Sequence, residues 1–126
     1  MPDEINWDPL RALARRVLQE GETFVLTSDV HTLLERTASE VGIRDADAAR
    51  ALLTEEGALE LLRESARRIH DGSWRVTRAL HQMYRHQQAG DYDSARQEMR
   101  NVLAVEVVPL YREIAQDQLD DMADQP

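Results

Sequence analysis

Residues 59–87 read LELLRESARRIHDGSWRVTRALHQMYRHQ, and the spacing of their core-type side chains decides the fold. These positions follow one another at alternating intervals of three and four: Leu59, Leu62, Ala66, Ile69, Ser73, Val76, Leu80, Met83 and Gln87. The alternation keeps one face of an α-helix aligned over roughly eight turns. Such a seam has to be buried against other helices, so the stretch predicts helix-on-helix packing.

Gly72 lies in the middle of this stretch. A glycine inside a helix costs about 1 kcal/mol relative to alanine and often marks a break. The alternation of three and four does not change phase at Gly72. We therefore predict one helix over residues 55–89, and we leave a kink at Gly72 open.

Gly90 and Asp91 supply a helix stop and a new cap on consecutive residues, which predicts a tight turn between two antiparallel helices. The second helix is expected over residues 91–122. Pro109 lacks a backbone N–H, so we expect a bend there. Pairing about the turn places Val76 opposite Val105.

The N-terminal part contains three shorter apolar stripes, the first formed by Leu10, Leu13, Ala14, Val17 and Leu18. Each predicted helix begins at a residue able to cap free backbone N–H groups: Asp8, Thr27 or Ser28, Asp45, Thr54 and Asp91. The stripes and caps predict three short helices before the long hairpin.

These patterns predict an all-α fold, a small bundle of four to five helices with a long C-terminal antiparallel hairpin as its spine. The expected organisation is a single domain, 1–126, with a polar lead (1–7), three short helices (8–53), the hairpin (55–89 and 91–122) and a tail that frays (123–126). The seam is long for a chain of 126 residues, which leaves a homodimer open.

The composition narrows the class of protein. With no cysteine, the chain has no disulfide, no thiol nucleophile and no cysteine-ligated zinc. No basic-then-apolar leader begins the sequence, and no apolar run approaches the ~20 residues of a membrane span. We therefore expect a cytoplasmic protein with no membrane partner.

The net charge of −9 is unevenly distributed. Residues 63–86 carry six arginines against two acids, a local balance of +4 that leaves −13 for the rest. A basic helix among acidic neighbours of its own fold explains this pattern. Two functional explanations are also open: an acidic surface that binds a basic partner, or a strip of arginines that binds an acidic partner. The overall sign argues against nucleic acid as a partner.

A set of motifs extends over nearly the whole chain: Trp7, Leu13, Val17-Leu18 and Gly21; Arg68-Ile69-His70-Asp71-Gly72-Ser73; Ala89-Gly90-Asp91 with Ala95-Arg96; and Val102-Leu103-Ala104-Val105-Glu106-Val107-Val108-Pro109-Leu110-Tyr111-Arg112. The last motif is the most specific. Together they resemble the DUSAM family of small myxobacterial proteins. The resemblance implies multiple paralogues, which suits partner-specific adaptors or immunity and antitoxin proteins, and it carries over no activity or site residue.

Glu106 is the only charged residue in 102–110, and its predicted position faces the preceding helix. A buried carboxylate must be paired, hydrogen-bonded or protonated. The hairpin register offers Arg75 or Arg78 as its partner, and we predict a buried ion pair between Glu106 and Arg78. A catalytic role would need a second carboxylate or a nucleophile beside Glu106, and the sequence offers neither there.

The histidines do not have the spacing of a metal site. His70, His81 and His86 are eleven and five residues apart, whereas metal-binding histidines on one helix are three or four apart. We therefore predict no metal, no cofactor and no catalytic residue.

Trp74 lies beside the seam and next to Arg75. It could flank the core or stack on Arg78, or it could be an exposed anchor for a protein partner, a role in which Trp and Arg are common. We take Trp74, Arg75 and Arg78 as candidate partner-binding residues. The leading hypothesis is a non-enzymatic protein–protein interaction module, an adaptor or regulatory binder. The alternative is an immunity or antitoxin-like protein whose acidic surface neutralises a basic effector.

Overall fold

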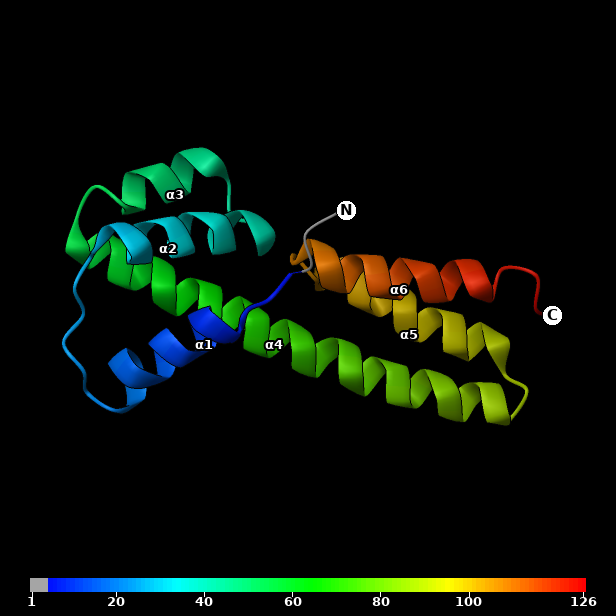
Figure 1. Ribbon diagram of the computed structural model, residues 1–126. Helices are drawn as coiled ribbons and strands as arrows, with labels where there is room; N and C mark the ends of the chain where they lie inside the picture. The colour runs from blue at the N-terminus through cyan, green and yellow to red at the C-terminus, as the bar shows by residue number, and fades with distance from the viewer. Residues whose placement is uncertain (1–4) are drawn as a thin grey trace. The chain divides into compact units, whose positions relative to one another are not determined.

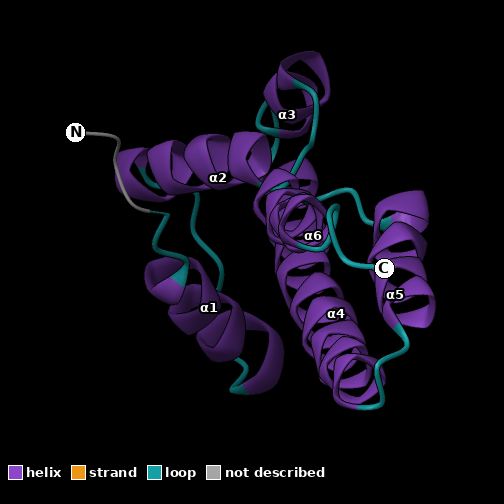
Figure 2. Cartoon of the chain, turned by 90° about the vertical axis from the view of Figure 1, so that its right-hand side faces the viewer, coloured by secondary structure: helices purple, strands orange, loops and turns teal. Residues whose placement is uncertain are grey.

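The computed structural model describes residues 5–126, and every element in that range is helical. In chain order the elements are α1 (Asp8–Ala14), the π-helical turn η1 (Arg15–Gln19), α2 (Ser28–Glu40), α3 (Asp45–Ala51), α4 (Glu55–Gln88), α5 (Tyr92–Val105) and α6 (Pro109–Asp121) (Figure 1). Loops connect them (Figure 2). The predicted all-α class is confirmed. Residues 1–4 of the predicted polar lead lie outside the described range.

The chain divides into two compact units, Met1–Arg68 and Ile69–Pro126. The division falls within α4, which is one helix of 34 residues. In the first unit, α2 contacts both α1 and α3. Arg68 Nη1 donates to the carbonyl oxygen of Val41 at the end of α2, so a side chain of α4 satisfies a free helix terminus.

The predicted seam of α4 is confirmed. Four of its positions are buried and alternate with half-buried ones; the buried four are Leu62, Ile69, Val76 and Met83. The helix also continues through Gly72, as the unchanged phase of the pattern predicted.

Three of the predicted caps are confirmed: Thr27 Oγ1 accepts from Val30 N, Thr54 Oγ1 from Gly57 N, and Asp91 Oδ1 from Ser94 N. The predicted caps Asp8 and Asp45 are wrong. Both lie in the first turn of their helices, after the residues Trp7 and Arg44 that occupy the capping positions without a side-chain bond. An acid in a first turn still interacts favourably with the helix dipole.

The first helix departs from the predicted pattern after Ala14. Its chain continues as η1, a π-helical turn, which holds more residues per turn than an α-helix. Residues spaced for an α-helix therefore leave the buried face. Leu10 and Leu13 are buried, whereas Leu18, predicted in the core, is 37% exposed.

In the second unit, residues 69–88 of α4 share a core with α5 and α6. The fully buried cluster consists of Met83, Ala95, Met99, Val102, Ala115 and Met122. Half-buried side chains surround it, among them Leu80, Leu103 and Leu119. Arg96 Nη1 donates to the carbonyl oxygens of Met122 and Gln125, and Gln125 belongs to the tail (123–126) that we expected to fray.

The single helix predicted over residues 91–122 is wrong, because the chain forms two helices there. α5 ends at Val105, and α6 begins at Pro109. Pro109 cannot donate to a carbonyl of the preceding turn, and a residue before proline avoids the α conformation. Val108 is accordingly extended, with φ −80° and ψ 118°. The expected bend is therefore a complete interruption.

Candidate functional site

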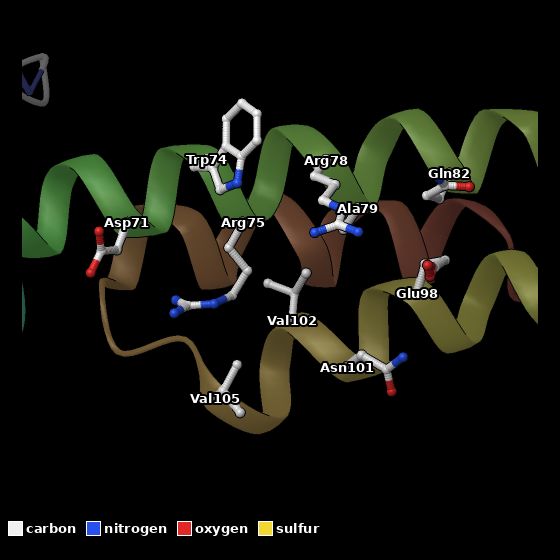
Figure 3. Close-up of a pocket in the computed structure, with 10 residues that line it drawn as sticks. All are labelled: Asp71, Trp74, Arg75, Arg78, Ala79, Gln82, Glu98, Asn101, Val102 and Val105. Carbon is white, nitrogen blue, oxygen red and sulfur yellow. The ribbon is translucent and has the colours of Figure 1, made fainter.

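A groove with a volume of about 640 Å³ lies between α4 and α5. Ten residues line it (Figure 3): Asp71, Trp74, Arg75, Arg78, Ala79, Gln82, Glu98, Asn101, Val102 and Val105. All ten belong to the second unit. The three candidate partner-binding residues predicted from the sequence are therefore brought together at one surface feature.

The helical period explains why these side chains share the groove. On α4 the lining residues recur at intervals of three or four, which places them on one stripe of the helix. On α5 the residues Glu98, Asn101, Val102 and Val105 form the facing stripe. Val102 is 2% exposed and also belongs to the core cluster, so it forms a well-supported part of the groove floor.

Trp74 stands on the rim of the groove with its ring directed away from α5 (Figure 3). It is 67% exposed, which excludes the interpretation of Trp74 as a flank of the core. Arg78 is also exposed, and within residues 5–126 it has no hydrogen-bond or ion-pair partner. The rim of α4 thus offers a large apolar ring and an unpaired guanidinium group.

Arg75 extends from α4 toward α5 (Figure 3), where its Nη1 donates to Glu106 Oε1 at 2.6 Å. The Glu106 side chain is 1% exposed and that of Arg75 is 38% exposed. The predicted pair of Glu106 with Arg78 is therefore wrong, and the other candidate, Arg75, is the partner. Arg75 and Arg78 are about one turn apart on α4. Because α5 ends at Val105, Glu106 lies opposite Arg75 and not opposite Arg78.

The second oxygen of Glu106 holds the interruption between the helices. Glu106 Oε2 accepts from the backbone N–H of Val107 at 3.1 Å and of Val108 at 2.9 Å. These donors precede α6 and have no helical partner, so the carboxylate satisfies them. Glu106 therefore joins α4 to the loop through one oxygen and shapes the loop through the other.

Gly72 allows this arrangement to lie close to α4. A Cβ at this position would be 2.9 Å from Glu106 Oε2 and 2.6 Å from Cε2 of Tyr111. Tyr111 is buried and its hydroxyl donates to the carbonyl oxygen of Ile69 at 3.0 Å. Gly72 is thus required because Tyr111 and Glu106 pack closely against α4 at this position, and not because the helix breaks there.

Sequence reasoning missed the α5 side of the groove. Val105, predicted opposite Val76 in the hairpin core, is 59% exposed, and Val107 is 51% exposed. Pro109 was the sequence signal for the early end of α5. Val108, directly before the proline, avoids the helical conformation, and the β-branched Val107 also disfavours it. α5 therefore ends at Val105, which lies exposed at the helix terminus.

Between residues 5 and 126, no group of three or more His, Asp or Glu side chains could hold a metal ion. His70 Nδ1 lies 3.2 Å from Asp71 Oδ1, an exposed contact between neighbours in the chain. None of the helices in this range combines the length and apolar character needed to cross a membrane.

Comparisons with known proteins give a family and no activity. No similar protein was found among curated proteins or among solved structures. A family model, described as a protein of unknown function (DUF2379), matches residues 5–122 and so includes both compact units apart from their ends. Because this match extends over nearly all of the sequence, the chain belongs to the DUF2379 family.

Proposed function

We propose that this chain is a protein-binding module whose partner docks on the groove between α4 and α5. The observation that carries the proposal is that the same groove rim presents an exposed Trp74 and Arg78, which has no hydrogen-bond or ion-pair partner within residues 5–126. Trp and Arg are the residues most often found at the energetic centre of protein interfaces. A partner would remove the Trp74 ring from water and supply a counter-charge to Arg78.

The size of the apolar contribution supports a role in binding. A tryptophan side chain buries about 150 to 250 Å². At about 25 cal/mol per Å², covering the exposed two thirds of the surface of Trp74 would contribute a few kcal/mol to association. The exposed part of Trp74 contributes no burial free energy to folding. A partner that covers it would explain why a large apolar side chain lies at this exposed position.

The groove is supported by rigid contacts, which favours binding further. Val102 connects its floor to the core, and the bond from Arg75 to Glu106 fixes α4 against the end of α5. A surface ordered before binding loses less conformational entropy when a partner arrives.

Site-specific photo-cross-linking tests the proposal. A photoreactive phenylalanine analogue placed at Asn101 inside the groove should cross-link a protein in lysate of the source cells, and the Trp74→Ala/Arg78→Ala variant should abolish the product. The same analogue at Tyr84, exposed on α4 outside the groove, is the matched control. Equal products from both positions, or none from Asn101, would contradict the proposal.

A second candidate, the neutralisation of a basic effector in the manner of immunity proteins, is supported by the acidic surface of α6. Glu113, Asp117 and Asp121 are exposed, and none forms an ion pair within residues 5–126. A complex made by this surface should dissociate steeply as salt screens the charges, whereas a complex anchored by Trp74 should resist moderate salt. The resemblance to the DUSAM family is compatible with either candidate, and we keep membership of it as a proposal.

A further inference from the structure

The two sides of the α4–α5 pair differ in what covers them. On one side, α6 contributes Ala115, and Met122 after its end, to the shared core. On the other side lies the groove, with α6 behind the two helices (Figure 3). Val102 takes part in both, since it contacts the core cluster and lines the groove. Within the described residues, the second unit is thus a three-helix arrangement in which the α4–α5 groove is open on the side away from α6.

We propose that this groove receives an amphipathic helix of the protein partner, which completes a four-helix packing and places an acidic residue beside Arg78. This inference rests on the proposed binding function and adds the chemical class of the ligand. The incoming helix would carry an apolar stripe over Ala79 and Val102, flanked by its acid on the α4 side.

The backbone around the groove selects a helix over an extended peptide. An extended peptide gains affinity by adding a strand to a free sheet edge. α4 and α5 have no free edge because their backbone groups bond within each helix. A polyproline segment needs a groove lined by several aromatic rings, and Trp74 is the only aromatic residue among the ten. A helix laid between two helices needs only side-chain contacts.

The dimensions also suit a helix. The lining residues of α4 extend from Asp71 to Gln82, which is about 16 Å at 1.5 Å per residue, or three turns. Three turns match a partner helix with apolar residues at i, i+3 or i+4, and i+7. Ala79 is small and half-buried, so it allows a neighbouring helix to approach closely.

The charge of the groove centre selects an acidic helix. Arg75 and Arg78 lie in the middle of the α4 stripe, and Arg78 has no partner within residues 5–126. The acids of the groove lie toward its ends, where Asp71 contacts His70 and Glu98 lines the groove with Gln82 and Asn101. A carboxylate near Arg78 would form a charge-assisted hydrogen bond with its guanidinium group.

Two designed peptides test the inference with the full chain. Each is about 18 residues long, long enough for several helical turns, with leucines at i, i+4, i+7 and i+11 and alanine at most other positions. One peptide carries glutamates beside the leucine stripe, and the other carries lysines at the same places. Fluorescence anisotropy gives the Kd of each, and circular dichroism gives the helicity gained on binding.

The glutamate peptide should bind at least tenfold more tightly than the lysine peptide and gain helicity. Arg78→Glu should weaken its binding at least tenfold and strengthen binding of the lysine peptide. The matched control is Arg85→Glu, a charge reversal at an exposed arginine of α4 outside the groove, which should leave both Kd values within about twofold. Thermal melts establish that each variant is folded.

The failures are distinguishable. If neither peptide binds, or both bind alike, while Asn101 cross-links a partner, the helical acidic ligand is wrong and the binding function stands. Equal effects of the Arg78 and Arg85 reversals would remove the groove as the site. Sedimentation that shows a dimer of the chain dissociated by Arg78→Glu would assign the groove to a second copy and overturn the proposal.

Discussion

Arg75 reaches from α4 to the buried carboxylate of Glu106, and a hydrogen bond of 2.6 Å joins the two side chains. The same carboxylate accepts two backbone N–H groups from the loop that separates α5 from α6. One acidic side chain therefore joins α4 to the end of α5 and holds the loop between α5 and α6. Removal of either partner leaves the other with unsatisfied hydrogen-bonding groups.

Glu106→Gln should destabilise the protein by about 2 kcal/mol, which would lower the Tm by several degrees. The amide keeps the shape of the side chain but has one acceptor oxygen in place of two, so its NH₂ group must face either Arg75 or the loop N–H donors. Thermal and urea unfolding measure the loss. Glu113→Gln, an exposed change on α6, is the control and should have little effect. An unchanged Tm for Glu106→Gln would exclude the structural role.

Gly72→Ala should also destabilise the protein, although alanine favours a helix by about 1 kcal/mol. The added methyl group would meet the buried Tyr111 ring, whose hydroxyl is held by Ile69, and the overpacking cost of about 1 to 3 kcal/mol exceeds the gain in propensity. Ser73→Ala on the next residue is the control. Increased stability of Gly72→Ala in urea unfolding would show that the close contact is not real.

The long seam was predictable because burial and helical periodicity act on the same residues. A side chain at every third or fourth position must lie on one face, and Leu62 through Met83 does so in the structure. Caps were predictable where a hydroxyl or carboxylate directly precedes a helix, as at Thr54 and Asp91. These are local rules, and they hold without knowledge of the partner helix.

The identity of the partner of Glu106 depended on a non-local feature. Arg75 and Arg78 are one turn apart, so the choice between them depends on where α5 ends. The sequence marks that end only by Pro109, and a proline is compatible with a bend as well as with an interruption. The π-helical turn after Ala14 has no comparable sequence signal, which is why Leu18 was misplaced.

Asp91 makes the stability of the hairpin turn depend on pH. Hydrogen bonds from the Ser94 side chain and backbone hold the pKa of the Asp91 carboxyl below its ordinary value. A carboxyl with a lowered folded-state pKa contributes stability above its unfolded pKa and loses it as the pH falls through the folded value. Asp91→Ala should therefore be less stable than the wild type at neutral pH, with a difference that narrows below about pH 4.

Urea unfolding of wild type and Asp91→Ala across this pH range tests the expectation. Asp117→Ala removes an exposed acid of α6 that has no hydrogen bond or ion pair within residues 5–126, so it serves as the control for a general charge effect. If the difference between wild type and Asp91→Ala were constant with pH, or grew in acid, the cap would not contribute through its ionised form.

Arg112 stabilises the end of α5 from the next helix. Its Nη1 donates to the carbonyl oxygens of Leu103 at 2.7 Å and of Glu106 at 2.8 Å, which are free acceptors at the end of α5. Arg112→Met should cost about 1 kcal/mol and speed amide hydrogen exchange in residues 102–108. Arg100→Met, an exposed arginine on α5 without a partner in the described range, is the control. Unchanged exchange in 102–108 would contradict the capping role.

Trp74→Ala should separate stability from binding. Because Trp74 is 67% exposed, removal of its ring takes little apolar surface from the core, and the change in unfolding free energy should stay within about 0.5 kcal/mol. Ile69→Ala on the same helix, at a site 2% exposed, should cost roughly 2 to 5 kcal/mol. The two variants should differ in the opposite way in their effect on binding. Trp74→Ala should lose the Asn101 cross-link. Ile69→Ala, studied at a low temperature at which it is folded, should keep it. A large loss of stability from Trp74→Ala would mean that the ring supports the fold, and the groove would then lose the residue that marks it as a binding surface.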